Sequence, residues 1–433
     1  MTFLSRGFVA AILFAGRKSP GGSKDLARKA LAGAILSIAL GLIPLITVME
    51  VADGMIQGIS ARYIELATYH AQIKAYPGHN LKDAKALLAA SPEISGAWIE
   101  SQSLGVVFTD GKSEGVSVRG LEQGFLDHPA TREYLRLHDG SLTLERPNDA
   151  LIGQALADKL AVKPGSIISL VSVKRTASGS MLPKILVLYV KGIVSAGYRE
   201  IDAQWLLLKQ DYVEKNLPEE TVLSFVGIKA GNPFKNAFAA KEAAMDVLPN
   251  GYSILAWREV ASNLFESLAS TRTMLLIIMA VTVAVASFNI SSALTTMVQE
   301  RQQEIALLRS VGSMPKDIHW IFAMGGTVLG AAGAFIGCIG GILVSINING
   351  ILGLIEKTGN AGRQLFKGFS PSMDMADHKL LDPAYYLDRI PVEINIRNII
   401  IIACLTILLS FLASLGPAKK AGSLSPQESF KRR

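Results

Sequence analysis

One short polar segment between two apolar stretches has the composition of a docking or force-transmitting helix. It runs from Gln299 to Trp320, QERQQEIALLRSVGSMPKDIHW, and its apolar residues stand among charged ones as in an amphipathic helix. Gly312 stands where that helix would end, and Pro315 stands near the first turn of the next one. A short helix joined rigidly to two apolar helices can pass on the push of a docked protein. An ordinary connector at a membrane interface would show the same pattern.

Residue types that carry catalysis, nucleotide binding or metal binding form no recognisable motif in this sequence. The histidines lack metal-ligand spacing, and one sequence supports no serine–histidine–acid arrangement. The segment GRKSPGGSK, residues 16–24, comes nearest to a nucleotide-binding G-x-x-x-x-G-K-[ST] loop, but it lacks the lysine after the second glycine. We therefore expect a chain that is not an enzyme and that binds no cofactor or metal itself.

The elements that position the polar segment are apolar stretches long enough to cross a membrane. A crossing needs roughly 20 apolar residues, and four stretches qualify: about Ala30–Met49, Met274–Val298, Trp320–Gly350 and Asn398–Leu415. Their interiors hold no aspartate, glutamate, lysine or arginine. Ion-coupled carriers need such groups inside the membrane, so any coupling energy should come from outside the bilayer. Cys338 and Cys404 lie within these stretches, and we interpret them as small packing residues.

Charge outside these stretches sets the expected orientation. Of the 433 residues, 50% are hydrophobic and 18% are charged, with a formal net charge of +7. Lysine and arginine dominate the segments before the first stretch and after the fourth, so we expect both termini in the cytoplasm. This topology accounts for the positive charge, and no nucleic-acid partner is expected. The first stretch is long and lacks a clear cleavage site, which indicates an uncleaved anchor.

About 220 residues separate the first two stretches, enough for one or two domains. Apolar residues continue at helical spacing beyond the first stretch as far as Leu66, which predicts a stalk. Farther along, Asp110-Gly111 between two β-rich runs is a strong hairpin signal. The run IISLVSV is expected to pair with residues Ile185 to Val194 across a loop. Helical runs alternate with these strands, which predicts an α+β domain.

Three segments resemble the MacB/FtsX-type superfamily of ABC-transporter permeases, and within it the lipoprotein-releasing permeases LolC and LolE. The first surrounds the second apolar stretch and includes FNI at 288–290, the run E-x-x-x-E-I-A-L-L-R from Glu300, and the SVG that follows. The second consists of LIGQALADKLAVKPGSIISL and GIVSAGYREIDAQWLLL in the large insert. The third is FLASLGPAKKAGSLSPQESFK at the end of the sequence. The resemblance covers essentially the whole chain.

This resemblance implies a type VII ABC permease, an α-helical membrane protein with four transmembrane helices and a large α+β periplasmic domain inserted between helices 1 and 2. The chain would be a multi-pass protein of the inner (cytoplasmic) membrane, in contact with membrane lipid. The expected order is a basic cytoplasmic segment (1–29), transmembrane helix 1 (30–50), a MacB-like periplasmic domain with stalks (51–272), transmembrane helix 2 (273–298), a cytoplasmic coupling-helix loop (299–317), transmembrane helix 3 (318–350), a second periplasmic loop (351–396), transmembrane helix 4 (397–416) and a cytoplasmic tail (417–433).

The resemblance also assigns roles to the polar segment and to partners. The segment would be a coupling helix that docks on a separate, LolD-like ATPase subunit, and that subunit would bind the ATP and magnesium. Its candidate residues are Glu300, Glu304, Ile305, Leu307, Leu308, Arg309, Val311 and Gly312. Two permeases would form the membrane assembly, and the second would be either another copy of this chain or a paralogue.

Two further sites are expected of a lipoprotein-releasing member. Acyl chains of the substrate would enter between apolar helices near the periplasmic end of the permease pair, although ordinary helix packing would explain the same residues. The candidate lining residues are Ile46, Met49, Met55, Ile59, Phe265, Leu268 and Met274. The loop from Lys174 to Lys184 lies where such permeases recruit a LolA-like periplasmic carrier, with Arg175, Met181, Leu182 and Pro183 as candidate contacts.

The function expected from these features is extraction of lipoproteins from the inner membrane and their transfer to the periplasmic carrier, driven by ATP hydrolysis on the partner subunit. A MacB-like efflux permease and an FtsX-like regulator of cell-wall hydrolases are the alternatives. MacB proteins usually carry a fused ATPase and the FtsX outer domain is usually much smaller, so both alternatives rank lower.

Overall fold

The computed structural model describes residues 24–175, 181–367 and 390–423, and the chain divides into two compact units. The helical unit comprises the residues up to Gly54, then Ala269–Ala376, and the residues from Pro391 onwards. The α+β unit comprises Met55–Leu268 together with Asp377–Ile390. Each unit has a hydrophobic core of its own.

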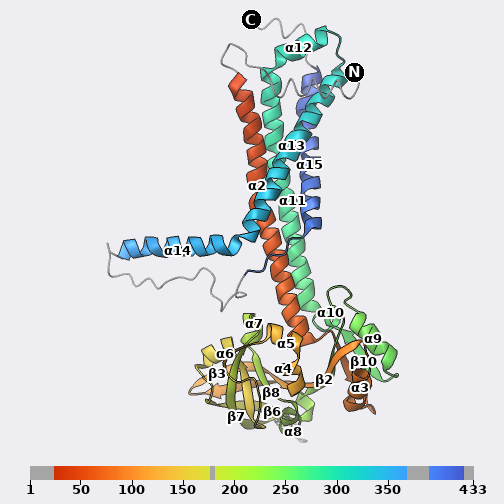
Figure 1. Ribbon diagram of the computed structural model, residues 1–433, viewed down its shortest axis with the longest axis vertical. Coiled ribbons are helices and arrows are strands. Elements are labelled where there is room, and N and C mark those ends of the chain that lie inside the picture. The colour runs from red at the N-terminus through yellow and green to blue at the C-terminus, as the bar shows by residue number, and fades with distance from the viewer. Residues whose placement is uncertain (1–23, 176–180, 368–389, 424–433) are drawn as a thin grey trace. The chain divides into compact units, whose positions relative to one another are not determined.

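Four long helices dominate the helical unit and lie side by side (Figure 1). They are α2 (Lys24–Arg62), α11 (Ser262–Glu300), α13 (Pro315–Ile346) and α15 (Ile396–Ser423). Each contains a window long and apolar enough to cross a membrane, as the sequence indicated. The boundary between the two units falls inside α2 and inside α11, so both helices continue into the α+β unit.

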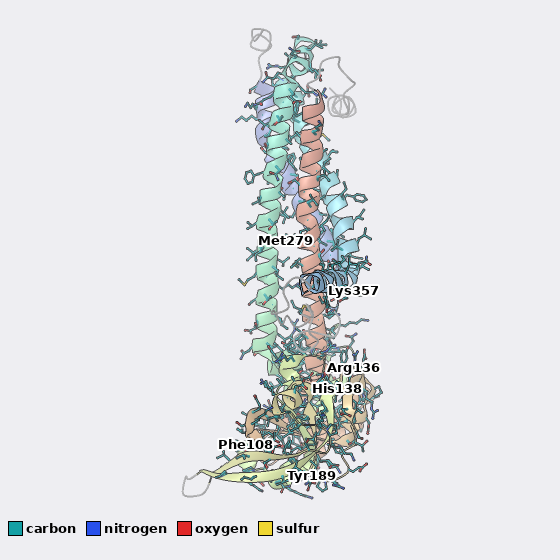
Figure 2. The ribbon with its side chains drawn as sticks, turned by 90° about the vertical axis from the view of Figure 1, so that its left-hand side faces the viewer. Phe108, Arg136, His138, Tyr189, Met279 and Lys357 are labelled. Atoms are coloured by element: carbon teal, nitrogen blue, oxygen red, sulfur yellow. The ribbon has the colours of Figure 1, made fainter. Side chains whose placement is uncertain are left out.

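The third long helix ends earlier than the sequence analysis indicated. α13 ends at Ile346, and the Asn347 side chain donates a hydrogen bond to the carbonyl of Leu343 at 2.9 Å. A separate helix, α14 (Ile348–Lys367), follows where the sequence analysis continued the span to Gly350 and placed a loop after it. α14 points away from the long helices (Figure 1) and carries Lys357 (Figure 2). Asn347 interrupts the apolar run and caps α13, so the long helix ends there.

Small residues on α13 let α2 and α15 approach it closely. A Cβ atom added at Gly326 or Gly330 would collide with the side chain of Ser414 or Ser410 on α15. The contacts with α2 pair Gly333 with Ile38, Gly337 with Leu42, and Gly341 with Ile46. The glycines at four-residue spacing therefore serve packing within the chain, as small residues do between membrane helices.

The α+β unit is built on a ten-stranded sheet with helices packed on it (Figure 1). The strand order is β10-β1-β9-β2-β3-β8-β5-β7-β4, and β6 pairs with both β2 and β7. The strands are β1 (Ala71–Ala75), β2 (Ile94–Thr109), β3 (Lys112–Leu121), β4 (Arg136–Gly140), β5 (Asp149–Gly153), β6 (Ile167–Arg175), β7 (Met181–Ser195), β8 (Trp205–Lys209), β9 (Leu223–Ala230) and β10 (Tyr252–Ala256). The helices are η1 (Tyr63–Thr68), α3 (Leu81–Ala89), α4 (Gln123–Asp127), α5 (Pro129–Tyr134), α6 (Gln154–Leu160), α7 (Arg199–Asp202), α8 (Gln210–Asn216), η2 (Glu219–Thr221), α9 (Ala239–Val247) and α10 (Trp257–Val260).

Two hairpins predicted from the sequence are present in this sheet. β2 and β3 pair up to the register Thr109↔Lys112, and the turn residues Asp110 and Gly111 have φ of +38° and +83°. Both angles are positive, which confirms the turn signal. β6 and β7 also pair with each other, as expected for IISLVSV and the run after it.

A buried ionic network lies in the core of the α+β unit. The Arg119 guanidinium donates two hydrogen bonds to the Glu100 carboxylate, at 2.6 Å and 2.7 Å, and the two side chains are 2% and 0% exposed. Tyr69 donates a third hydrogen bond to this carboxylate at 2.6 Å. Burial and the negative charge of Glu100 raise the pKa of Tyr69 well above its ordinary value. Burial alone would lower the pKa of Arg119, but the charge of Glu100 raises it, so the guanidinium stays charged.

Candidate functional site

The segment predicted to be a coupling helix folds as a short helix between two long ones. α11 ends at Glu300, and Arg301 leaves the helical conformation with φ −100° and ψ 19° before α12 (Gln302–Ser310) begins. Gly312 follows α12 with φ +101°, a conformation that glycine adopts without strain. α13 then starts with Pro315 at its beginning, where the missing N–H group costs nothing.

α12 divides its apolar residues between the core and the surface. Ile305 is fully buried in the core of the helical unit. Leu307 and Val311, in contrast, are 62% and 81% exposed, and Met314 just beyond them is 67% exposed. One face of the helix is therefore held by the bundle, while the other presents an apolar surface. We call Leu307, Val311 and Met314 the coupling patch.

The remaining candidates of this segment lie around the coupling patch. Arg301 donates a hydrogen bond to the Glu304 carboxylate at 2.6 Å, one turn along the chain. Glu300 is exposed at the end of α11, and Arg309 is half-buried. Leu308 is partly buried and packs against the same core as the buried face of α12. The structure thus separates Ile305 and Leu308, which pack against the core, from the exposed coupling patch.

The predicted carrier loop belongs to the hairpin of β6 and β7, which projects from the sheet (Figure 2). The pairs Lys174↔Leu182 and Arg175↔Met181 belong to these strands, so the strands extend into the segment that the sequence analysis treated as loop. Pro183 lies on β7 and is exposed. Residues 176–180 lie outside the described residues, as do the side chains of Arg175, Met181 and Leu182.

The residues predicted to line an acyl-chain cavity are divided between the two units. Ile46 and Met49 are buried in the core of the helical unit, where Ile46 packs against Gly341. Met274 is 65% exposed on α11. The others, Met55, Ile59, Phe265 and Leu268, belong to the α+β unit. Close packing of α2 on the glycines of α13 is the reason that Ile46 faces inwards.

An exposed apolar stripe runs along α11 in the helical unit. Its members are Met274, Ile278, Val281, Val285 and Phe288, each at least 58% exposed. They are spaced alternately by four and three residues, which places them on one face of the helix. The neighbouring helix α2 exposes Leu36, Leu40 and Val48, and the two helices touch where Gly41 faces Ala286. Together these two helices offer a wide apolar surface to lipid, to an acyl chain or to another helix.

A polar cluster in the helical unit was missed by the sequence reasoning. Arg272 on α11 forms an ion pair with Asp53 of α2 at 2.9 Å, and Asn398 of α15 donates to the same carboxylate at 2.6 Å. The Glu50 carboxylate accepts the backbone N–H of Asn395 at 2.8 Å. The cluster therefore ties α2 to α11 and to the start of α15.

The backbone packs closely at the same place, since a Cβ atom at Gly54 would collide with the carbonyl of Pro391. The available signal was the pair Glu50 and Asp53, one helical turn apart directly after an apolar stretch. Asn398, the partner of Asp53, lies 345 residues away from it, which no local pattern reveals.

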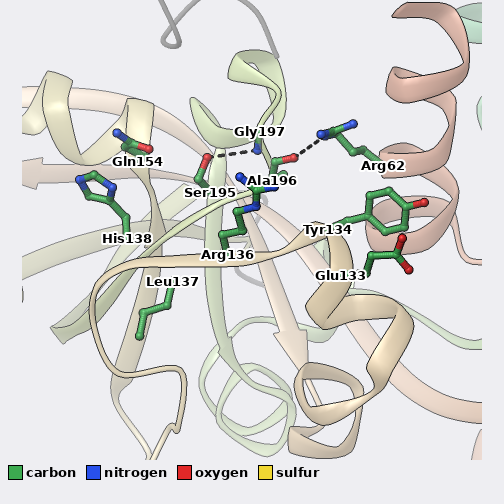
Figure 3. A pocket seen from close by; sticks show the side chains of 10 residues that line it. All are labelled: Arg62, Glu133, Tyr134, Arg136, Leu137, His138, Gln154, Ser195, Ala196 and Gly197. Atoms are coloured by element: carbon green, nitrogen blue, oxygen red, sulfur yellow. Dashed lines mark hydrogen bonds between the residues drawn. The ribbon is translucent and has the colours of Figure 1, made fainter. Parts of the chain in front are cut away.

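The α+β unit has a polar pocket of about 230 Å³ at the end of α2 (Figure 3). There Arg62 donates a hydrogen bond to the carbonyl of Ala196 at 2.8 Å. Ser195 donates to Asp202 at 2.7 Å and accepts the N–H of Gly197, which has φ +68°. Burial raises the pKa of Asp202, and the hydrogen bonds from Ala196 and Ser195 oppose that shift. The segment GIVSAGYREID, singled out in the sequence, thus holds the end of α2.

Two family models match the chain, one from α2 through most of the α+β unit and one over α11, α13 and α15. The MacB-like periplasmic core domain matches residues 31–219, and the FtsX-like permease C-terminal domain matches residues 276–426. The chain belongs to the MacB/FtsX-type permease superfamily. Its coupling patch lies in the FtsX-like part of the permease, and the pocket at Arg62 lies in the MacB-like part.

Curated relatives align with the permease over nearly its whole length. The lipoprotein-releasing system transmembrane protein LolC of Xylella fastidiosa (strain 9a5c) is 28% identical over 405 residues, which cover 92% of each chain. LolC of Neisseria meningitidis serogroup B is 24% identical over 92% of each chain. LolE of Haemophilus influenzae is 24% identical over 91% of this chain and 92% of its own. The solved periplasmic region of MacB from Actinobacillus actinomycetemcomitans is 15% identical, with a TM-score of 0.32, over 47% of this chain and 95% of that one.

The two family models and the curated relatives, together with the four long helices, confirm the family and the fold class expected from the sequence. The permease is a membrane protein with four helices able to cross the bilayer and a large periplasmic α+β domain between the first two. It belongs to a family of ABC-transporter permeases.

Proposed function

We propose that this permease extracts lipoproteins from the inner membrane and passes them to a periplasmic carrier, with ATP hydrolysed on a separate subunit. Its LolC and LolE relatives are named for lipoprotein release and align with it over about nine-tenths of its length, 92% of the chain for LolC. The observation that carries the proposal is the coupling patch, an exposed apolar surface on a helix whose other face is buried in the bundle.

The coupling patch is the docking surface for the ATPase subunit in this proposal. α12 stands between the ends of two membrane-crossing helices, and an exposed apolar patch outside the bilayer marks a protein contact. Because Ile305 of the same helix is buried in the bundle, a push on Leu307 or Val311 reaches α11 and α13 directly. The ATP and magnesium bind to the LolD-like partner, and the permease contributes no nucleotide site.

The proposed topology places α12 and both chain termini in the cytoplasm and the α+β domain in the periplasm. The lysine and arginine residues that flank the first and fourth spans support this orientation. It puts the coupling patch on the side of the membrane where ATP is available.

The α11 stripe is the surface that we assign to the second permease and to the acyl chains between the two. Met274 belongs to this stripe, and its alternating four- and three-residue spacing suits contact with another helix. Ile46 and Met49 support the surface from behind rather than line it. The second permease is either a copy of this chain or a paralogue.

The β6–β7 hairpin is the surface that we assign to a LolA-like carrier. It projects from the sheet (Figure 2), and Pro183 near its end is exposed. A projecting hairpin can reach a soluble partner without disturbing the sheet that carries it.

The proposal is tested by depleting the permease and fractionating the membranes for acylated lipoproteins. Outer-membrane lipoproteins should accumulate in the inner membrane, and the wild-type gene should restore sorting. The double variant Leu307→Asp, Val311→Asp should fail to restore it, whereas Met245→Asp, at a residue 56% exposed on α9, should succeed. Normal sorting after depletion would overturn the proposal. Sensitivity to toxic compounds or a division defect instead would favour an efflux permease or an FtsX-like regulator.

A further inference from the structure

A second pocket lies in the helical unit, between the first turn of α13 and the last turn of α15. It measures about 320 Å³ and is lined by Pro315, Lys316, His319, Trp320, Lys419, Gly422 and Ser423. The two helix ends are close there, because a Cβ atom at Gly422 would approach the carbonyl of Pro315 at 2.8 Å. Glycine at position 422 allows the two helix ends to approach this closely.

The charged groups around this pocket suit an anionic group. Lys316 and Lys419 are both exposed and come from different helices, so their ammonium groups can approach one ligand from two sides. His319 adds a ring nitrogen that can donate a hydrogen bond. Asp317, the acidic neighbour in the chain, is 6% exposed and does not line the pocket.

The surface next to the pocket is apolar and continues along the membrane-crossing part of α15. At 3.6 residues per turn, Lys419, Leu412, Leu408 and Ile401 lie within an arc of about 40° on that helix. The three apolar residues are 51%, 54% and 51% exposed, in that order. Lys419 therefore stands at the end of an exposed apolar stripe.

Trp320 of α13 lines the same pocket. It is 47% exposed, and its ring lies 6.4 Å from that of Phe411 on α15. Tryptophan is enriched at the boundary between the headgroups and the acyl chains. The basic pocket suits the phosphate group of a phospholipid, and the aromatic ring and the apolar stripe suit its acyl chains.

We propose that this pocket binds the phosphate group of an anionic phospholipid, with the acyl chains along the exposed face of α15. In the topology proposed above, the lipid belongs to the cytoplasmic leaflet, where basic pockets between membrane helices bind acidic headgroups. The bound lipid would bridge α13 and α15 directly after α12 and so steady the helix that carries the coupling patch. The pocket is separate from the α11 stripe assigned to the substrate, so the lipid proposal is tested independently of what the permease transports.

Trp320 makes the test direct, because the other three tryptophans, Trp98, Trp205 and Trp257, are buried in the α+β unit. The full-length permease is reconstituted in phosphatidylcholine vesicles that contain either brominated phosphatidylglycerol or brominated phosphatidylcholine at the same mole fraction. Bromine quenches tryptophan fluorescence at short range, and a Trp320→Phe variant provides the background to subtract. Phosphatidylglycerol should quench Trp320 more strongly than phosphatidylcholine does.

Charge removal then identifies the site. The variant Lys316→Gln, Lys419→Gln should lose this preference, by about fivefold for each lysine and roughly 30-fold together. Lys420→Gln, at an exposed lysine outside the pocket, should keep it. A preference that survives the double variant would overturn the proposal. Competition by soluble inorganic phosphate would show a site for free phosphate instead, and loss of quenching when the ATPase subunit binds would show a protein-docking surface.

Discussion

Removal of the coupling patch should weaken the ATPase complex without unfolding the permease. In Leu307→Ala, Val311→Ala, the side chains lost are 62% and 81% exposed, so the isolated permease loses little packing. Full burial of such side chains is worth about 1.5 to 3 kcal/mol each. Scaled by the exposed fractions and reduced for the methyl groups that remain, the two together contribute about 2 to 3 kcal/mol to docking. At 1.4 kcal/mol per tenfold, the dissociation constant should rise about 30- to 150-fold.

The assay combines affinity and stability in one preparation. The ATPase subunit is first recovered together with tagged wild-type permease. It is then titrated against wild-type and double-variant permease in nanodiscs to obtain the dissociation constants. Thermal unfolding of each permease is recorded in parallel. The midpoint of unfolding should stay within about a degree, since surface changes are usually within 0.5 kcal/mol. Ile305→Ala is the contrasting variant, because truncation of a fully buried isoleucine costs about 2 to 5 kcal/mol of folding free energy. Unchanged ATPase affinity in the double variant, with normal folding, would refute the docking role of α12.

Three further perturbations test the packing that supports the site. Gly330→Ala should lower the stability of the helical unit by about 1 to 3 kcal/mol, because the added Cβ collides with a serine of α15. Gly350→Ala is the control and should leave the stability unchanged, because its Cβ meets nothing within 4 Å. Thermal unfolding in detergent compares the two variants. Glu100→Gln leaves the Arg119 guanidinium buried without its counter-charge and should cost about 3 to 5 kcal/mol, measured by urea unfolding of the α+β domain in the whole chain. Asp53→Ala should cost about 1 to 3 kcal/mol, less than a fully buried pair because its arginine is 35% exposed, and an unchanged unfolding midpoint would contradict the role of the polar cluster.

Local signals in the sequence predicted the elements that depend on neighbouring residues. The Asp110-Gly111 turn is one case, because a two-residue hairpin turn needs positive φ at both positions and this residue pair adopts such angles readily. The start of α13 at Pro315 is another, because the proline ring fixes the first turn of a helix. Apolar runs likewise predicted the four long helices, because the thickness of the bilayer sets the minimum length of an apolar run that can cross it.

Contacts between distant segments could not be predicted in this way. The sequence shows Ile305 and Leu307 as equivalent apolar residues of one helix, and only the bundle decides that the first is buried and the second exposed. Likewise, the sequence does not show that Ile46 packs against Gly341 and is therefore buried in the core. The stop of the third span at Ile346 depends on a single polar residue after a long apolar run, which hydropathy averaged over many residues hides.

The polar cluster has a consequence for how the permease is made. Asp53 and Glu50 leave the ribosome with the first span, Arg272 follows with the second, and the groups at Asn395 and Asn398 arrive only with the last. Until then the carboxylate at position 53 lacks the amide donor that lies 345 residues ahead of it. Closure of the bundle at this end is therefore a post-insertion event, and a chain truncated before α15 should expose its unsatisfied carboxylates to membrane quality control.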